Sequence, residues 1–292
     1  MKVGYVALMG RPNVGKSTLL NTILGQKVAI ISDKPQTTRA SILGIKTTDK
    51  GQIIFVDNPG IHRPLHRLNK RMMNFVYSSL ETADLVVLLI DATLKYGHGD
   101  EFVIDMLKKV TTPLFLLINK VDIVKKEKIL LLIDKYKDLL DFKEIIPISA
   151  LKGTNVDVLG ENIVNYLPEA EQIYGDDDVS DQSLRFLMSE IIREKLLAHV
   201  RQELPFVTAV HIEQMEERGP GKKYIKARIF VEKDTHRKII IGRQGSLIKR
   251  IGTEARKEME DILEAKVFLD LHVRVKEKWR DRPGVLDLIE GQ

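Results

Sequence analysis

The feature that most constrains the fold is a loop of eight residues between an aliphatic run and a helix-like segment. The aliphatic run covers residues 3–9, and helical spacing begins at Lys16. The loop has the pattern G-x-x-x-x-G-K-[ST], whose backbone N–H groups and following helix N-terminus surround the phosphates of a nucleotide. Its residues are Gly10, Arg11, Pro12, Asn13, Val14, Gly15, Lys16 and Ser17, followed by Thr18. A strand, this loop and a helix in that order predict a nucleotide-binding α/β domain rather than an ordinary glycine-rich turn.

Two residues, Ser17 and Asp57, predict a Mg²⁺ site. The hydroxyl group of Ser17 is placed to bind Mg²⁺, while the neighbouring Lys16 can reach the β- and γ-phosphates. A second ligand is Asp57, which ends the aliphatic run 53–56 and begins the sequence Asp57-Asn58-Pro59-Gly60. This short sequence alone is also typical of a turn, and the nearby phosphate loop favours the functional interpretation.

Short aliphatic runs alternate with amphipathic segments through the first 167 residues. Two runs flank Asp49-Lys50-Gly51, which indicates a hairpin. The expected strands are 3–9, 41–48, 52–56, 85–90, 114–118 and 144–148, and the expected helices are 16–24, 100–110, 126–140 and 155–166. Buried parallel strands are apolar on both faces, as these runs are. The alternation therefore predicts a doubly wound, mostly parallel sheet.

A base-recognition sequence follows the run 114–118. It consists of Asn119, Lys120, Val121 and Asp122. A carboxylate here can accept hydrogen bonds from N1–H and the 2-amino group of guanine. Adenine lacks both donors and would leave the carboxylate unpaired, which is costly. After the next run, Ser149, Ala150 and Leu151 begin a segment that we expect to contact the base through its backbone.

An acidic segment with Pro and Gly separates this domain from a second one. We expect domains at 1–170 and 183–292, joined by a linker at 171–182. The second domain is predicted to contain a helix over 184–204, strands over 207–216 and 224–231, a helix ending at Ile241, a helix over 246–265 and a strand over 267–275. In the last strand one set of positions is entirely aliphatic and the other set is polar except for Phe268, as in a strand with one buried face. The aliphatic positions are Val267, Leu269, Leu271, Val273 and Val275, which alternate with Phe268, Asp270, His272, Arg274 and Lys276. The order predicts a small α+β domain.

The second domain contains the pattern I-I-G-x-x-G-x-x-I, which resembles a KH module of the bacterial type, type II. A G-x-x-G loop lets a nucleic-acid backbone approach between two helices and clamps about four nucleotides. We expect bases to lie against the apolar face that includes Ile239 and Ile240. The predicted RNA-binding residues are Ile239, Ile240, Gly242, Arg243, Gln244, Gly245, Lys249 and Arg250. An interaction domain that binds no RNA is the alternative.

Together these motifs resemble the Era family of bacterial GTPases, in the TrmE-Era-EngA-like superfamily. The resemblance rests on R-P-N-V-G-K-S-T-L-L-N, P-Q-T-T-R, V-D-N-P-G-I-H, N-K-V-D and S-A-L-K, and it extends to the KH pattern. It implies GTP and GDP as ligands, Mg²⁺ as the cofactor and Thr38 as a third Mg²⁺ ligand, with Thr37 as the alternative. Lys16, Thr38 and Gly60 are the residues that it implies for catalysis.

The same resemblance implies a biological role. It predicts binding to single-stranded 16S rRNA near the 3′ end and action in maturation of the small ribosomal subunit. It also predicts a cytoplasmic monomer with a peripheral contact to the inner membrane.

One position departs from Ras-like GTPases. The glutamine that orients the attacking water in Ras is replaced here by Ile61, which we also place at the nucleotide. An isoleucine side chain makes no hydrogen bond to water, so we expect slow intrinsic hydrolysis that RNA stimulates. Arg11 and Arg39 are weak candidates for an arginine finger. His62 and His66 have helical spacing but no third ligand that would complete a metal site.

Composition excludes several other function classes. The chain has no cysteine, so it has neither disulfides nor thiolate chemistry. This disfavours an RNA-modifying GTPase that uses a cysteine. The net charge of +5 indicates a polyanionic partner without proving one. A membrane-associated signalling GTPase is the remaining alternative, and the sequence shows no lipidation motif in support of it.

Overall fold

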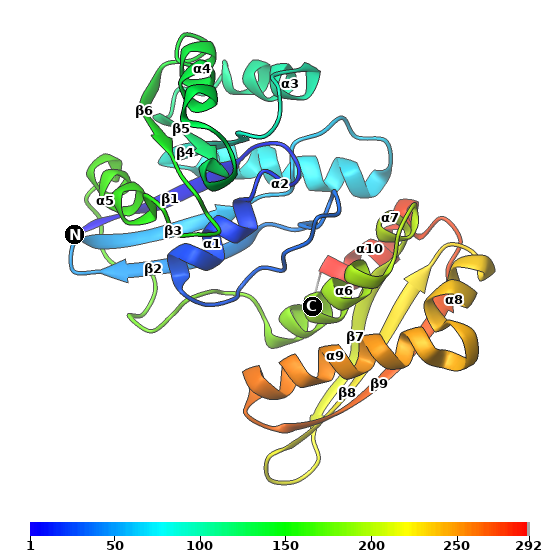
Figure 1. Ribbon diagram of the computed structural model, residues 1–292. Helices are drawn as coiled ribbons and strands as arrows, with labels where there is room; N and C mark the ends of the chain where they lie inside the picture. The colour runs from blue at the N-terminus through cyan, green and yellow to red at the C-terminus, as the bar shows by residue number, and fades with distance from the viewer. Residues whose placement is uncertain (291–292) are drawn as a thin grey trace. The chain divides into compact units, whose positions relative to one another are not determined.

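The computed structural model describes residues 1–290, which separate into two compact units (Figure 1). The first unit holds residues 1–64 and 69–181, and the second holds residues 65–68 together with the chain from Gln182 onward. Most of the segment that we predicted as a linker therefore belongs to the first unit. The backbone N–H of Ile45 donates to the carbonyl oxygen of Val179 at 2.8 Å, and Ser180 Oγ donates to that of Leu43 at 2.7 Å.

The first unit is built on a six-stranded sheet with the order β2-β3-β1-β4-β5-β6. Every neighbouring pair is parallel except β2 and β3, which form the predicted hairpin. The strands are β1 (Lys2–Met9), β2 (Ile42–Thr48), β3 (Gly51–Asp57), β4 (Leu85–Asp91), β5 (Leu114–Asn119) and β6 (Phe142–Pro147). The prediction of a doubly wound, mostly parallel sheet is confirmed.

Helices cover both faces of this sheet. The helices are α1 (Lys16–Leu24), α2 (Arg67–Thr82), α3 (His98–Leu107), α4 (Lys126–Tyr136) and α5 (Val156–Tyr166), with a 3₁₀ turn, η1 (Val121–Ile123), after β5. Helices α1 and α5 pack together on one face, while α2, α3 and α4 contribute to the hydrophobic cluster on the other. Since β1, β3 and β5 end at the same edge, the loops after Met9, Asp57 and Asn119 meet there.

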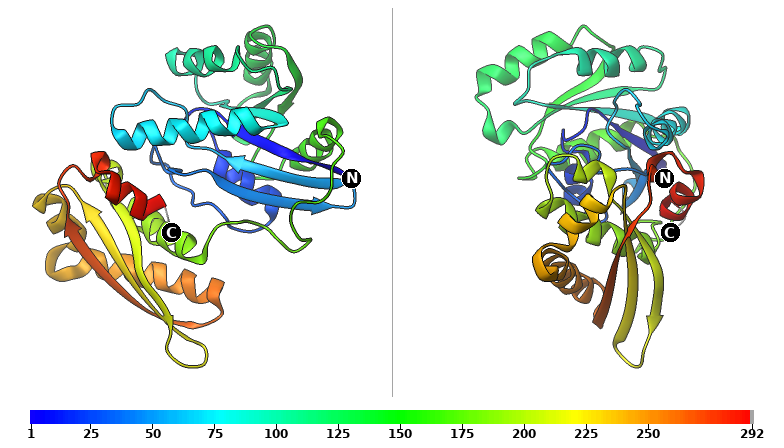
Figure 2. Two further views of the ribbon diagram at one scale, coloured as in Figure 1. Left: turned by 180° about the vertical axis from the view of Figure 1, so that it is seen from behind. Right: turned by 90° about the vertical axis from the view of Figure 1, so that its right-hand side faces the viewer.

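The second unit is a three-stranded sheet with helices. Its elements are α6 (Leu184–His199), α7 (Leu204–Val207), β7 (Ala209–Glu217), β8 (Lys222–Val231), α8 (Asp234–Ile241), η2 (Arg243–Gly245), α9 (Ser246–Leu263), β9 (Lys266–Val275), η3 (Trp279–Asp281) and α10 (Pro283–Glu290). Strand β8 is central, antiparallel to β7 and parallel to β9. Within this unit, α9 and α10 lie on opposite sides of the sheet (Figure 2). The predicted order of helices and strands is confirmed.

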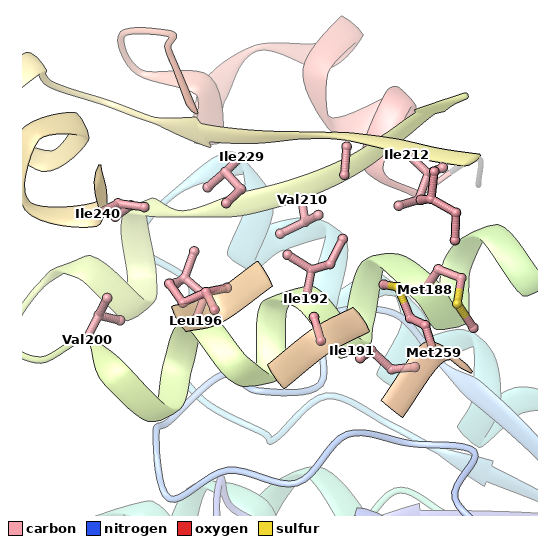
Figure 3. Packing of buried hydrophobic residues seen from close by; sticks show 14 of the residues in the cluster. Met188, Ile191, Ile192, Leu196, Val200, Val210, Ile212, Ile229, Ile240 and Met259 are labelled. Atoms are coloured by element: carbon pink, nitrogen blue, oxygen red, sulfur yellow. The ribbon is translucent and has the colours of Figure 1, made fainter. Parts of the chain in front are cut away.

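The core of the second unit explains why the sequence alternates. Apolar side chains of α6 point toward the sheet, and Figure 3 shows Ile192 and Leu196 beneath Val210 and Ile229. In β9 the apolar residues pack against this core, whereas Phe268 on the other face is 68% exposed. Strict alternation along β9 thus gives it one buried face, as predicted.

The helices differ from our prediction in length and in number. Helix α6 ends at His199 rather than at residue 204, because the backbone of Val200 is extended, and a separate short helix, α7, begins at Leu204. Helices α2 and α10 were not predicted. Among residues 1–290, no helix is both long enough and apolar enough to span a membrane.

Candidate functional site

The phosphate loop after β1 curls tightly around an open pocket. Its backbone has positive φ at Gly10, Asn13 and Gly15, with values of 144°, 65° and 102°. A Cβ atom at Gly15 would lie 2.3 Å from Asn119 Nδ2, so only glycine lets these two segments approach so closely. The loop leads directly into α1, whose first backbone N–H groups face solvent or an anion.

The side chain of Lys16 is fixed inside this loop by hydrogen bonds to the backbone. Its side chain is buried, and Nζ donates to the carbonyl oxygens of Gly10 at 3.3 Å and Arg11 at 3.2 Å. Burial lowers the pKa of Lys16 to about 8, and the nearby carboxylate of Asp57 works in the opposite direction. An anionic phosphate group beside Nζ would favour the charged form and stabilise the ammonium ion there.

Three side-chain oxygens converge beside Lys16. Ser17 Oγ donates to Asp57 Oδ2 at 2.5 Å and lies 3.0 Å from Thr38 Oγ1. Asp57 is fully buried, and within the described part of the chain its Oδ1 has no hydrogen-bond partner. Burial also raises the pKa of Asp57 to about 6, which Lys16 and Ser17 partly oppose. A buried carboxylate with an unsatisfied oxygen, next to two hydroxyl groups, fits a hard cation such as Mg²⁺.

The adjacent residue Thr37 also lines the pocket, but its hydroxyl group bonds away from Ser17. Thr37 Oγ1 donates to the carbonyl oxygen of Lys34 at 2.6 Å, whereas Thr38 Oγ1 lies beside Ser17. Both side chains are buried. The geometry therefore distinguishes two residues between which the sequence left the choice open.

The base-recognition loops are joined by Asn119. Its Nδ2 donates to the carbonyl oxygen of Val14 at 2.7 Å, and its Oδ1 accepts from the backbone N–H of Ala150 at 2.9 Å. Lys120 adds a second link, since its Nζ donates to the carbonyl oxygen of Asn13 at 3.0 Å. The phosphate loop and both base loops are thus fixed to one another, while the Asp122 side chain stays exposed at the pocket.

These loops enclose a pocket of about 520 Å³. The predicted residues that line it are Pro12, Asn13, Gly15, Lys16, Ser17, Thr18, Thr38, Gly60, Asn119, Lys120, Asp122, Ala150 and Leu151. The predicted residues that lie outside its lining are Gly10, Arg11, Val14, Asp57, Asn58, Pro59, Ile61, Val121 and Ser149. Asp57 is nevertheless joined to the site, because its Oδ2 accepts the hydrogen bond from Ser17 Oγ.

Several lining residues were missed by sequence reasoning. They are Ile30, Ile31, Ser32, Asp33, Gln36 and Ile123. Five of the six lie in the irregular segment between α1 and β2, where no periodic pattern shows which side chains turn inward. Ile31 is 46% exposed, which the folded chain shows and the apolar sequence of residues 28–31 does not.

Ile61 does not face the pocket. Its side chain is 2% exposed and belongs to the hydrophobic cluster that includes Met73 and Val76, while its N–H donates to the carbonyl oxygen of Gly10 at 3.0 Å. Arg11 is also turned away, because its Nη1 donates to Asp100 Oδ2 at 2.9 Å. Neither side chain is positioned to contact a nucleotide from within the pocket lining.

The G-x-x-G loop of the second unit forms η2 between α8 and α9. Gly242 and Gly245 have positive φ values of 75° and 79°. A Cβ at Gly242 would lie 2.8 Å from the Leu247 nitrogen, whereas within residues 1–290 no atom beyond the two chain neighbours lies within 4 Å of a Cβ at Gly245. Gly242 is therefore required by the fold, and Gly245 leaves open space at the surface. Arg243 and Gln244 between them are exposed.

The flanking residues divide into accessible and buried ones. Lys249 and Arg250 are exposed at the start of α9, and Arg250 Nε donates to Glu254 Oε1 at 3.1 Å. Ile239 is 51% exposed, but Ile240 is fully buried in the core of this unit. This corrects our expectation that bases lie against the Ile240 side chain, because α8 turns that residue toward the sheet.

Comparisons with known proteins agree with both units. Residues 5–120 match a family model described as 50S ribosome-binding GTPase, and residues 203–280 match one described as KH domain. The protein named GTPase Era of Halothermothrix orenii is 46% identical over 285 residues, which cover 98% of this chain and 97% of that protein. GTPase Era of Leuconostoc citreum is 47% identical over 290 residues, covering 99% and 96%. The chain belongs to the Era family of GTPases.

Solved structures of the Era family have the same architecture. One is the crystal structure of Era in complex with MgGDPNP and nucleotides 1506-1542 of 16S ribosomal RNA, with a TM-score of 0.94, 43% identity and coverage of 99% of this chain and 98% of that one. Another is a variant of Aquifex aeolicus Era bound to GDP.AlF4⁻, with a TM-score of 0.93, 43% identity and 99% coverage of each chain. Membership of the Era family makes this chain a P-loop GTPase with a KH domain.

Proposed function

We propose that this chain is a Mg²⁺-dependent GTP switch that binds 16S rRNA near its 3′ end and acts in assembly of the small ribosomal subunit. The observation that carries the proposal is the joining of two sites in one chain. The cluster of Ser17, Thr38 and Asp57 beside a guanine-reading loop suits GTP, and the open loop at Gly245 suits an RNA backbone. The Era structure with 16S rRNA nucleotides supports the choice of RNA.

Each polar group of the nucleotide site has a proposed role. The phosphate loop and Lys16 bind the β- and γ-phosphates, and Asp122 binds the guanine ring. Asn119 keeps these two parts of the site in register through Val14 and Ala150. Gly60, at the pocket wall, presents backbone next to the γ-phosphate.

Ser17, Thr38 and Asp57 are the residues that would hold Mg²⁺. Thr38 is preferred over Thr37 because the Thr37 hydroxyl group donates a hydrogen bond to the backbone carbonyl oxygen of Lys34. When bound, the metal ion neutralises charge that develops on the phosphate oxygens. Replacing Thr38 with alanine should weaken Mg²⁺-dependent GTP binding, whereas Thr37→Ala should change it little, as measured by Mg²⁺ titration of nucleotide binding.

The intrinsic rate of hydrolysis is proposed to be slow. Ile61 is buried in the core and contributes no hydrogen bond to a water molecule at the pocket. The water must then be placed by other groups of the chain or by a bound partner. RNA is the proposed partner that raises the rate.

RNA binding is proposed at the surface formed by η2 and the start of α9. Arg243, Lys249 and Arg250 provide positive charge, and Gln244 with Ile239 provides polar and apolar contacts for bases. The loop glycines allow the backbone of the RNA to come close. A cytoplasmic location, a monomeric state and a peripheral membrane contact stay predictions that rest on the family resemblance.

The test is a pair of matched charge substitutions. Gly245→Asp places an acid in the open space of the loop at a φ that aspartate tolerates, so the fold should persist while RNA binding is lost. Gly221→Asp is the control, because Gly221 has a φ of 65°, also has nothing within 4 Å, and lies in the turn between β7 and β8. Equal RNA affinity of both variants in a filter-binding assay would contradict the proposal.

A further inference from the structure

Burial of Ile61 leaves one task of the hydrolysis reaction without an assigned residue. A Ras-like GTPase orients its attacking water with a side-chain amide at this position. Here that side chain lies in the hydrophobic cluster, and its N–H is bonded to Gly10. A side-chain amide of another residue that reaches the pocket could take over this role.

Gln36 reaches the pocket from the segment before β2. It lines the same pocket as Lys16 and Gly60, and it precedes Thr38 by two residues. Its φ is +61°, a left-handed conformation that is uncommon outside glycine and clusters at functional positions. A primary amide at this place offers both a donor and an acceptor of hydrogen bonds.

His62 links Gln36 to Gly60. Its Nδ1 lies 2.7 Å from the carbonyl oxygen of Gly60. Its Nε2 lies 2.7 Å from Asn69 Nδ2 and 3.4 Å from Gln36 Nε2. His62 thus touches two residues that line the pocket, Gln36 and Gly60, although it does not line the pocket itself.

The chemistry of these contacts fixes their direction. A carbonyl oxygen only accepts, so Nδ1 of His62 carries the hydrogen and donates to Gly60. In the neutral ring Nε2 is then the acceptor, and the amide groups of Asn69 and Gln36 both present nitrogen to it. With Nε2 of Gln36 turned to His62, its carbonyl oxygen Oε1 is the atom left to accept a hydrogen bond from water.

We propose that Gln36 orients the attacking water and that His62 is the positioning residue that holds Gln36. The inference rests on the proposed GTP hydrolysis at this site. In the step, the water oxygen forms a bond to the γ-phosphorus while the bond from that phosphorus to the β–γ bridging oxygen breaks. One water proton passes to an oxygen of the γ-phosphoryl group and the other stays on the attacking oxygen, so the products are inorganic phosphate, as dihydrogen phosphate, and GDP. Gln36 accepts a hydrogen bond from the water and is unchanged.

Single-turnover GTP hydrolysis by the full chain, with Mg²⁺, tests the proposal. Gln36→Ala should lower the rate at least about tenfold, while the Kd values for GDP and a GTP analogue stay within about twofold. Gln26→Ala, an exposed glutamine outside the pocket, is the matched control and should hydrolyse GTP at the wild-type rate. A Gln36→Ala rate within about twofold of wild type, or a loss of GTP affinity equal to the loss of rate, would overturn the inference.

Variants of His62 separate positioning from folding. His62→Ala and His62→Asn both remove the acceptor for Gln36 and should slow hydrolysis at least about threefold without changing Kd. His62→Gln places an amide oxygen near the position of Nε2 and should restore most of the rate. The double variant Gln36→Ala/His62→Ala should hydrolyse GTP no more slowly than Gln36→Ala alone, because His62 acts through Gln36. Additive losses would overturn the role given to His62.

The proposed function fails in a different way. If the wild-type chain hydrolyses no GTP, the proposed function falls and the inference falls with it. If the wild type hydrolyses GTP and Gln36→Ala does so equally well, only the inference is overturned.

Discussion

Asn119→Ala should destabilise the first unit and weaken nucleotide binding together. The side chain is 2% exposed and makes two hydrogen bonds, to the carbonyl oxygen of Val14 at 2.7 Å and from the N–H of Ala150 at 2.9 Å. Its loss would leave one buried acceptor and one buried donor without partners. At about 1–3 kcal/mol for each such group, the free energy of unfolding should fall by about 2–6 kcal/mol.

Urea denaturation can measure this change with an internal reference. Trp279 is the one tryptophan of the chain and lies in the second unit, so its fluorescence follows that unit. Circular dichroism follows both units. Asn119→Ala should shift the dichroism transition to lower urea and leave the fluorescence transition nearly in place. The Kd for GDP should rise at least about tenfold, because the loops that bind the phosphates and the base lose both hydrogen bonds of Asn119 and keep only the link from Lys120 to Asn13.

Asn165→Ala provides the control for this experiment. Asn165 is exposed on α5 in the same unit, and its removal should change stability by less than about 0.5 kcal/mol. If Asn119→Ala costs less than about 1 kcal/mol and leaves the Kd for GDP unchanged, the clamp has no energetic role and the reasoning is wrong.

Three further outcomes follow from the same structure. Asp122→Asn should lower the affinity for GDP at least about 100-fold and favour xanthine nucleotide, since an amide cannot accept both guanine donors. If isothermal calorimetry gives the same GDP affinity as for the wild type, Asp122 does not bind the guanine ring. Because burial raises the pKa of Asp57 to about 6 and Mg²⁺ requires the carboxylate, the affinity for Mg²⁺-GDP should drop as pH falls through that value, by up to about tenfold per pH unit. A flat profile between about pH 7 and pH 5 would refute this assignment, and Asp57→Asn should abolish the slope. Trp279→Phe removes the hydrogen bond from Nε1 to the carbonyl oxygen of Val207 at 2.8 Å and should lower the free energy of unfolding of the second unit by about 1–3 kcal/mol. An unchanged midpoint of thermal denaturation would show that this hydrogen bond contributes nothing to stability.

The sequence was most informative where spacing and chemistry coincide. The phosphate loop, Asp57 and Asn119 each end or follow an aliphatic strand, so the parallel sheet alone brings them to one edge. The alternation in β9 likewise predicted its buried face correctly. In both cases the local sequence pattern determines which side chains lie at the site or in the core.

Helix α2 shows what sequence reasoning overlooked. Its buried residues Leu68, Met72 and Val76 recur every four positions, which is a helical signal. Polar residues between and after them, including buried Asn69 and Ser79, masked the pattern. Their burial depends on hydrogen bonds such as that between Asn69 and His62, which only the folded chain reveals.

The catalytic side of the pocket was the least predictable part. Gln36 lies in a segment without periodicity, and its approach to His62 joins residues 26 positions apart in the chain. Ile240 failed for the opposite reason: the motif placed it at the RNA, but helical geometry turned one of two adjacent isoleucines into the core.

The central claim is that the GTP site and the KH unit are energetically coupled. Its most direct test is the Kd of an RNA with the sequence of nucleotides 1506-1542 of 16S ribosomal RNA, the segment present in the related Era structure, measured with GDP and with a GTP analogue. We expect the analogue to tighten RNA binding at least about fivefold, and the RNA to tighten binding of the analogue relative to GDP by the same factor, as linkage requires. Equal RNA affinity in both nucleotide states would contradict it.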